Sequence, residues 1–363
     1  MKVLIIFLTV FAGFFALNNC QTDQKSIVPT YNVQISHTDN KHSVRPIEDS
    51  LITLEGVSAH LPYGGSSGSW GMSGKGFTEQ GGTPIGADIK YYARYESAYY
   101  HLKANFPVDK VKELVQRAYA VDESESSDEP MKEFINILDE PDYRKKYNGY
   151  VKSYYKMSDL IFGFAPKGMV VVWLGFGPTQ IELGQYQAEK ITNESEIKRL
   201  KEKYQKIFSI DAALFEELER EYHLADESPE KWMKYRTRYS WAPQISSENR
   251  NFKLFSINTD YYNGERDILL RPFVENLSAK VKAIPREMDF FWETGKDEAF
   301  EGRIFFNWEK TNEAFANAGK NFKLNITVAP DNNSFEVYLN SQPFKADSLR
   351  IYKSERKFKE SYK

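Results

Sequence analysis

Apolar and polar residues alternate along two neighbouring stretches of the chain, residues 87–91 and 100–106. This alternation predicts two β-strands. Pro107 follows the second stretch, and apolar residues then recur at helical spacing up to Ala118. Because the φ angle of proline is already fixed near the helical value, we expect a helix to begin here.

Two hairpins are predicted from similar patterns. The first has arms at residues 160–164 and 169–174, joined through Ala165-Pro166-Lys167-Gly168. A strand pattern returns at residues 252–257, and the dipeptide Asn263-Gly264 that follows is typical of a tight hairpin turn. The chain is therefore expected to be rich in antiparallel sheet.

Residues 191–244 change to a helical pattern. Asn193, with Glu196 three residues later, resembles a capping box, and apolar residues then repeat with helical period up to Phe208. We predict a charged helical insert that separates two sheet-forming regions, residues 51–190 and 245–345.

The two sheet-forming regions echo one another. Pro84-x-x-Ala87-x-Ile89-x-Tyr91 is matched by Pro285-x-x-Met288-x-Phe290-x-Trp292, and Ala165-Pro166 by Ala329-Pro330. Each region reads strand, strand, helix, strand, strand, which is the form a repeat would take. We predict an α+β fold of two β-β-α-β-β-like modules with antiparallel sheets, plus the helical insert. Two unrelated regions with the same order of strands and helix would also look alike, so the alternative that the two regions are unrelated stays open.

The N-terminus has the layout of a secretory leader. Lys2 precedes an apolar run from Val3 to Leu17, which is too short to span a membrane comfortably. Cys20, the only cysteine, follows at the position where lipoprotein signal peptidase cleaves, although Asn19 stands where a small residue is usual. We predict removal of residues 1–19 and lipidation of Cys20. A plain cleaved leader and an uncleaved anchor are the alternatives.

Three further segments are predicted to lie outside the sheets. Residues 20–50 are polar and read as a tether with one short strand at residues 31–35. Residues 64–82 contain many glycines and read as a loop, and the acidic stretch Asp122–Glu129 as a solvated one. The charged tail at residues 346–363 reads as a frayed end.

Composition excludes some classes of partner. The formal net charge is −3, which gives no electrostatic footprint for nucleic acid. A single cysteine leaves no internal disulfide, and a structural zinc site is implausible. Aromatic residues make up 15% of the chain, which favours either β-structure or a recognition surface.

Motifs for catalysis are incomplete. Gly64-Gly65-Ser66-Ser67-Gly68 matches the nucleophile-elbow pattern, but the glycine-rich segment after it cannot form the required helix. The five histidines show no zinc-protease spacing, and no cofactor is expected. Trp173 and Trp292 are expected in the core. Trp70 and Gly71, in the glycine-rich loop, are the candidate contact residues.

Four segments in order carry a family resemblance: the lipoprotein leader, Ser69-Trp70-Gly71-Met72-Ser73-Gly74, Phe106-Pro107-Val108-Asp109-Lys110-Val111 and Phe162 through Leu174. Together they resemble the bacterial lipoproteins grouped as domain of unknown function 2931. The resemblance covers about Tyr31 to Lys190, with a looser echo to the C-terminus; Tyr91-Tyr92-Ala93-Arg94 departs from the family pattern. Positions that carry it, and that we expect to be structural, are Pro107, Pro166, Gly168 and Trp173.

The resemblance implies no established enzyme and no catalytic residues to carry over. Some members of the family lie beside phospholipase effectors of contact-dependent secretion, which implies an immunity lipoprotein. We therefore expect a non-enzymatic protein, lipid-anchored in the cell envelope (outer membrane or surface) of a Gram-negative bacterium, that binds a lipase-type effector. The alternatives are capture of glycan or peptide through exposed aromatics, and an esterase that uses Ser66.

Overall fold

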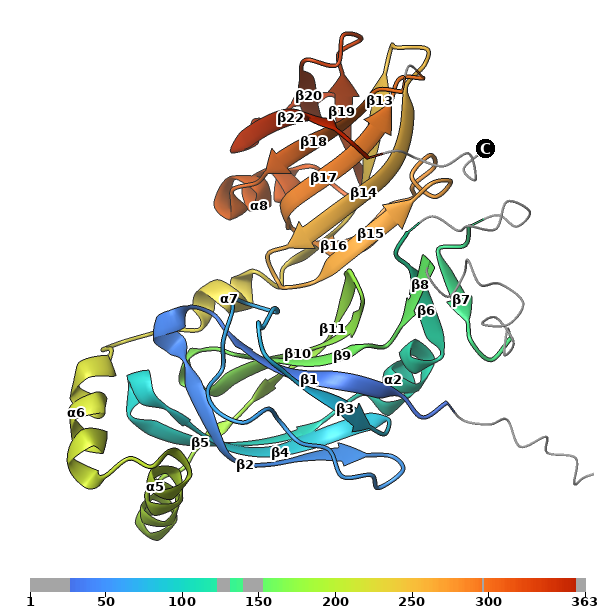
Figure 1. The fold of residues 1–363 in the computed structure, drawn as a ribbon. Coiled ribbons are helices and arrows are strands. Elements are labelled where there is room, and N and C mark those ends of the chain that lie inside the picture. The colour runs from blue at the N-terminus through green and yellow to red at the C-terminus, as the bar shows by residue number, and fades with distance from the viewer. Residues whose placement is uncertain (1–26, 123–130, 140–152, 296, 357–363) are drawn as a thin grey trace, which may run out of the picture.

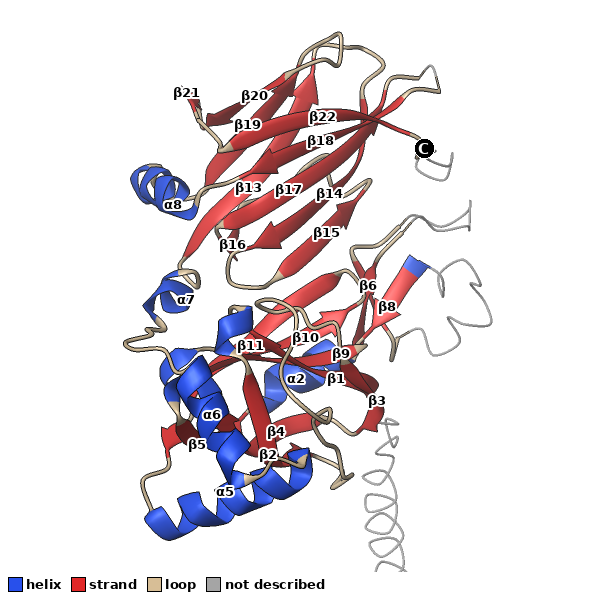
Figure 2. Cartoon of the chain, turned by 60° about the vertical axis from the view of Figure 1, so that its left-hand side comes forward, coloured by secondary structure: helices blue, strands red, loops and turns tan. Residues whose placement is uncertain are grey.

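A computed structural model describes residues 27–122, 131–139, 153–295 and 297–356. The predicted leader, Cys20 and nearly all of the acidic stretch Asp122–Glu129 lie outside the described residues. Strands predominate, most of them paired antiparallel, and α-helices lie against them (Figure 2). The expected combination of helices with antiparallel sheets is therefore confirmed. For description we divide the chain into an N-terminal half, residues 27–234, and a C-terminal half, residues 235–356 (Figure 1).

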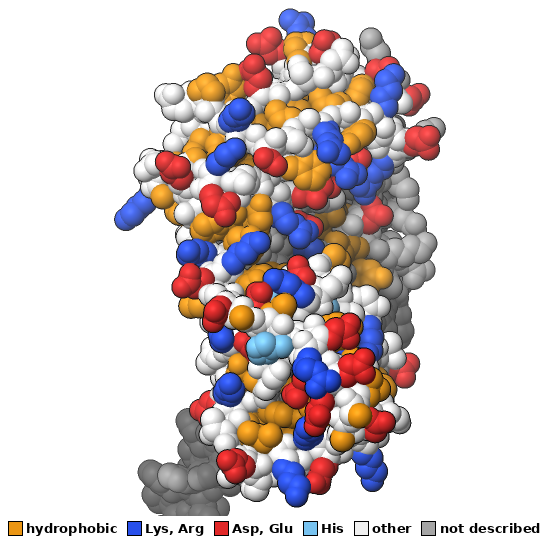
Figure 3. Space-filling view, turned by 90° about the vertical axis from the view of Figure 1, so that its left-hand side faces the viewer, with side chains coloured by type: hydrophobic (Ala, Val, Ile, Leu, Met, Phe, Trp, Pro, Cys, Tyr) orange, Lys and Arg blue, Asp and Glu red, His pale blue; other side chains and the backbone are white. Residues whose placement is uncertain are grey.

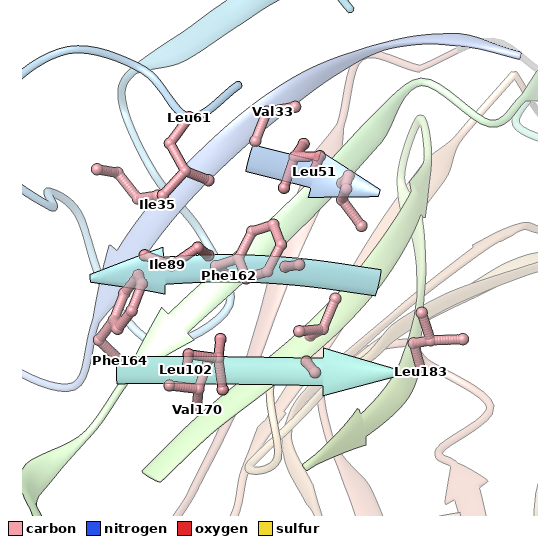
Figure 4. Packing of buried hydrophobic residues seen from close by; sticks show 14 of the residues in the cluster. Val33, Ile35, Leu51, Leu61, Ile89, Leu102, Phe162, Phe164, Val170 and Leu183 are labelled. Atoms are coloured by element: carbon pink, nitrogen blue, oxygen red, sulfur yellow. The ribbon is translucent and has the colours of Figure 1, made fainter. Parts of the chain in front are cut away.

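The N-terminal half contains two facing sheets. One has the order β12-β5-β4-β2, and the other, part of a larger sheet, has the order β11-β10-β9-β1-β3. Apolar side chains from the inner faces, among them Ile89, Leu102, Phe162 and Val170, pack between them (Figure 4). The strands are β1 (Thr30–His37), β2 (Val44–Thr53), β3 (Gly76–Gly81), β4 (Pro84–Ala93), β5 (Ala98–Asn105), β9 (Asp159–Phe164), β10 (Met169–Phe176), β11 (Thr179–Gln187) and β12 (Glu189–Lys190).

The short strand predicted at residues 31–35 is confirmed as β1, but the tether predicted around it over residues 20–50 is wrong from Thr30 onward. Strand β1 lies inside the sheet between β3 and β9, and Val33 and Ile35 are completely buried. Strand β2 begins at Val44 and forms an edge of the four-stranded sheet β12-β5-β4-β2. The loop predicted over residues 64–82 is likewise wrong at its end, because β3 begins at Gly76.

Smaller elements complete the N-terminal half. The predicted helix after Pro107 is confirmed as α2 (Val108–Val115), and the predicted hairpin at Pro166 as the antiparallel pair β9 and β10. A three-stranded sheet is formed by β6 (Arg117–Ala120), β7 (Phe134–Asn136) and β8 (Tyr154–Lys156). Short 3-10 helices are η1 (Asn40–His42), η2 (Arg94–Glu96) and η3 (Pro166–Gly168).

The predicted helical insert contains α5 (Glu194–Phe208), α6 (Ala212–Tyr222) and α7 (Glu230–Lys234). Leu200, Tyr204 and Phe215 of α5 and α6 pack with Ile47, Tyr92 and Tyr99 on the outer face of β2, β4 and β5. The insert ends earlier than the predicted residue 244. Arg238 already begins β13 (Arg238–Ser247), which pairs with two other strands.

The C-terminal half also contains two sheets. The order β22-β18-β17-β14-β15 continues the large sheet, and β16-β13-β19-β20-β21 forms a separate one. Their elements are β14 (Lys253–Tyr261), β15 (Arg266–Leu270), β16 (Lys280–Ala283), β17 (Pro285–Glu293), β18 (Ala299–Phe305), α8 (Trp308–Asn317), β19 (Phe322–Val328), β20 (Phe335–Leu339), β21 (Gln342–Pro343) and β22 (Ser348–Ser354). The tail was predicted to fray, but Ser348–Ser354 pairs with all of β18.

The strand pairings follow the same order in both halves. Strand β1 pairs in parallel with β9, as β13 does with β19. The antiparallel run β2-β4-β5 corresponds to β14-β17-β18. The edge strands β12 and β22 pair with β5 and β18 respectively. Among the helices that the structure describes, none combines the length and apolar character that a membrane crossing would need.

Candidate functional site

The two halves meet along a narrow joint. Within the large sheet, β11 and β15 are paired only at Gln180 and Arg266. Beside this pair lies a cleft of about 310 Å³ whose walls come from both halves. Its polar and aromatic lining residues are Tyr119, Glu133, Thr179, Gln180, Arg238, Tyr261, Glu265, Arg266, Asp267, Ser278, Lys280 and Lys282.

A buried carboxylate holds the joint together. Glu182 of β11 is only 4% exposed at its side chain, and its Oε1 accepts hydrogen bonds from Arg236 Nε (2.8 Å) and Nη2 (2.6 Å). Its Oε2 accepts one from Asn263 Nδ2 at 3.0 Å. A buried charge is tolerated when it is paired in this way. All of these donors belong to the C-terminal half, so the cluster ties the halves together.

Arg266 and Asp267 stand between the cleft and a second hollow. This hollow, of about 240 Å³, is also lined by Asn258, Glu287 and Asp289. Asp267 Oδ2 accepts hydrogen bonds from Tyr261 Oη (2.9 Å) and Lys282 Nζ (2.8 Å). We call the two cavities together the joint site.

Several polar atoms of the joint site are buried without a hydrogen-bond partner in the described part of the chain. They are Asn258 Oδ1, Arg266 Nε, Asp267 Oδ1 and Asp289 Oδ1. Buried polar groups in proteins are nearly always paired, so such a concentration marks a place where water or a ligand completes the hydrogen bonding. Three of the four atoms are acceptors, which favours a ligand that donates.

Asp289 is the most perturbed carboxyl group of the site. Burial, and then the negative charge of Glu287, raise its pKa to about 7. The nearest cation, Arg303, places its Nε 3.9 Å from Asp289 Oδ1 and binds Glu301 more closely, at 2.5 Å. Asp289 therefore changes its charge near neutral pH, where a positively charged ligand group would favour the ionised form.

The candidate contact residues lie at the joint, not on an open surface. Trp70 is half-buried, and its ring stands edge-on to Trp173 with centroids 5.0 Å apart. Gly71 is buried with φ +74°, and its carbonyl accepts a hydrogen bond from Gln180 Nε2 at 2.7 Å. A Cβ atom on Gly71 would lie 3.1 Å from Gly264 Cα, so glycine permits the two halves to approach closely.

The positions that carry the family resemblance serve the fold. Trp173 is completely buried, as expected, and its Nε1 donates to the carbonyl of Asn263 across the joint (3.2 Å). Pro107 directly precedes α2, and Pro166 opens the turn between β9 and β10. Gly168 is buried with φ +78°, where a side chain would meet the Ala188 carbonyl. Trp292 is also completely buried.

Ser66 has a partner that the sequence did not reveal. Its Oγ lies 3.0 Å from His37 Nδ1, and His37 Nε2 lies 3.2 Å from Asn40 Oδ1. The amide of Val44 donates to the same Oγ at 2.9 Å, and both Ser66 and His37 are buried. Burial lowers the pKa of His37. Ser66 therefore contacts the last residue of β1, His37, and the first residue of β2, Val44. These contacts hold the glycine-rich segment against the two strands.

Metal ligands do not cluster in the residues that the structure covers: no group of three or more His, Cys, Asp or Glu is placed to hold an ion. The lone Cys20 lies outside those residues.

Comparison with known proteins gives a family but no neighbour of known activity. The family model described as "Protein of unknown function (DUF2931)" matches residues 26–232, which are the N-terminal half up to α7. No curated protein and no solved structure matches the chain significantly. Because the family model covers more than half of the sequence, in agreement with the resemblance noted above, this chain belongs to the DUF2931 family.

Proposed function

We propose that this protein is a lipid-anchored component of the cell envelope that acts by binding a partner at the joint site. The observation that carries the proposal is the group of four unpaired polar atoms around Arg266 and Asp267, in cavities formed where the halves meet. The anchor itself is inferred from the leader and Cys20.

The chemistry of the site favours a basic group on the partner. Asn258, Asp267 and Asp289 each have an acceptor oxygen that receives no hydrogen bond, whereas Arg266 Nε is the one donor among the four atoms. A lysine or arginine side chain of a protein partner would satisfy several acceptors at once. Because the pKa of Asp289 is about 7, such binding should strengthen as pH rises from 6 to 8.

The proposed partner is a secreted lipase-type effector, which the protein would neutralise. This version comes from the family resemblance, and the acceptor-rich joint site supports a role in binding.

We further propose that the two halves are diverged copies of one β-β-α-β-β module. The support is the matching order of pairings: a parallel strand pair, an antiparallel three-strand run and an edge strand recur in each half. In this view the family match ends at residue 232 because it covers the first copy and the helical insert. The joint site then lies where the copies meet.

Competition between sister cells tests the proposed role. A strain that lacks the gene should be killed by the parent, and the wild-type gene should rescue it. Asp267→Asn combined with Asp289→Asn should fail to rescue at equal protein abundance, while Asp331→Asn, on an exposed turn, should rescue fully. Survival of the deletion strain at the parental level would refute neutralisation of an effector.

A second candidate function keeps one supporting observation. Tyr63 is 71% exposed and lines a groove with Phe77 and Phe208, which suits capture of a glycan or an extended peptide. Titration with envelope glycans should then give binding heat that Tyr63→Ala abolishes. Trp70 is no longer the residue to test for this function, because it packs on Trp173.

A further inference from the structure

Four apolar side chains stand exposed where the described chain begins. They are Val28, Ile52, Leu54 and Val57, each between 44% and 48% exposed. Backbone hydrogen bonds hold their segments together: the amide of Gly82 donates to the Pro29 carbonyl (3.1 Å) and that of Leu54 to the Thr83 carbonyl (2.9 Å). We call these four residues the apolar tip.

The segments that carry and surround the apolar tip contain almost no charged residues. Residues 27–35, 51–59 and 81–87 contain one charged residue, Glu55, in a chain of which 27% is charged. The Glu55 carboxylate is itself occupied, because it accepts hydrogen bonds from the amide (2.6 Å) and hydroxyl (2.7 Å) of Thr83. By contrast, the face in Figure 3 carries side chains of both charges scattered over both halves. Exposed apolar side chains that lie on neighbouring segments with so little charge are typical of a contact surface.

The position of the chain end identifies what covers this surface. Six residues lie between Cys20 and Ile27, and seven residue steps of extended chain reach at most about 25 Å. The described chain begins at Ile27, and the hydrogen bonds of Pro29 with Gly82 and of Leu54 with Thr83 place this start beside the end of β2. A lipid attached to Cys20 therefore keeps the apolar tip within this distance of the bilayer.

We propose that the apolar tip inserts into the membrane interface and sets the orientation of the body on the bilayer. This inference rests on the proposed lipid anchor and adds a second contact to it. Apolar side chains that enter the interface strengthen membrane attachment in proportion to the area they bury, and a lipid with a second membrane contact anchors more stably than one signal alone. The C-terminal half would then point away from the surface and leave the joint site accessible.

Site-directed spin labelling of the acylated full-length protein tests the proposal. Because Cys20 is the only cysteine and its sulfur would be blocked by lipid, Val57→Cys or Leu54→Cys provides a single free thiol. Val281→Cys, on the exposed β16 edge of the C-terminal half, is the matched control. The protein is bound to vesicles of phosphatidylethanolamine and phosphatidylglycerol, and the accessibility of each label to oxygen and to a water-soluble nickel complex is measured.

On vesicles, labels at positions 54 and 57 should lose accessibility to nickel and gain it to oxygen, while the label at 281 should not change. If the protein floats with the vesicles but all three labels stay equally accessible to nickel, the tip does not insert. That result would overturn the present proposal and leave the proposed lipid anchor intact. If it does not float and Cys20 reacts as a free thiol, the proposed anchor is wrong. Protection of positions 54 and 57 without vesicles would show that a second copy covers the tip, which also overturns the proposal.

Discussion

Asp289 combines burial with a negative neighbour, and both disfavour its ionised form. Its folded-state pKa of about 7 lies above the ordinary value of 3.8, so the folded protein holds this proton more tightly than the unfolded chain. By linkage, the free energy of unfolding falls as pH rises between about 4 and 7 and levels off above the folded-state pKa. The group therefore weakens the fold at neutral pH, which is consistent with a role in binding.

Replacement of Asp289 by Asn should remove this pH dependence. We expect Asp289→Asn to be more stable than the parent at pH 8, and by a clearly smaller margin at pH 5, as measured by urea unfolding. Glu287→Gln removes the second cause of the raised pKa, so it should move the midpoint of the transition to lower pH. An unchanged stability difference between pH 5 and pH 8 in Asp289→Asn would contradict the assignment.

Gly168 allows a comparison of backbone strain with a steric clash. Its φ is +78°, and an added Cβ would lie 2.4 Å from the Ala188 carbonyl oxygen. Gly319 has a similar φ of +87° with nothing within 4 Å. Gly319→Ala should therefore lower the free energy of unfolding only by the cost of the backbone strain, about 1 kcal/mol.

Gly168→Ala should lower the free energy of unfolding distinctly more than Gly319→Ala does, because the backbone of β10 or of residue 188 must also move. Thermal unfolding of the two variants side by side gives the difference. Equal destabilisation by the two variants would mean that the turn at Gly168 accommodates the added methyl group at no energetic cost.

Single residues show where sequence reasoning succeeds and where it stops. Trp173 was placed in the core from its apolar neighbours alone, and it lies there. Trp70 was interpreted as a surface residue because glycines surround it, but its partner Trp173 is far away in the sequence. The contact of Ser66 with His37 has the same origin. Local patterns report the periodicity of a segment and contain no information about which distant segment packs on it.

Helix α5 is attached to β2 by charges as well as by apolar packing. Glu48 accepts hydrogen bonds from Arg199 (2.6 Å) and Lys203 (2.9 Å), and these contacts, Arg199 first, hold its pKa well below the ordinary range. The helix begins at a proper N-cap, since Asn193 Oδ1 accepts from the amide of Glu196 at 3.0 Å.

Loss of the N-cap should weaken this element by a measurable amount. Asn193→Ala should lower the free energy of unfolding by about 1 kcal/mol, because an orphan amide of the first turn loses its acceptor. Asn193→Asp retains the acceptor and should stay near the parent value. Chemical denaturation of the three proteins provides the measurement, and equal stability of Asn193→Ala and parent would show that water replaces the cap.

Elements with strong internal patterns were predictable, and those defined by their partners were not. The helix after Pro107 and the hairpin at Pro166 have both periodicity and turn residues. Strand β1 was recognised only as a short strand in a tether, since polar residues flank it, yet it becomes central by pairing with β9. Strand β22 is mostly exposed, and only its pairing with β18 defines it.

At the scale of the whole molecule, the joint depends on few contacts. One residue pair links β11 to β15 in the large sheet, and the Glu182 cluster supplies the buried polar contacts beside it. Leu270 of β15 adds apolar contact by packing with Ala118, Ile135 and Tyr154 of the three-stranded sheet. A joint of this kind couples the halves while leaving the adjacent cleft open, so its strength should control whether they unfold together.

Glu182→Ala tests this coupling directly. The change leaves the buried Asn263 amide without its acceptor and takes the Glu182 carboxylate from the partly exposed Arg236 guanidinium, which should lower stability by about 3 kcal/mol. We expect one calorimetric transition for the parent and two for Glu182→Ala, because each half keeps its own core. Arg236→Ala should have a smaller effect in the Glu182→Ala background than alone, since the two residues form one cluster. A single transition at the parental temperature in Glu182→Ala would mean that the apolar contacts at Leu270 are enough to join the halves.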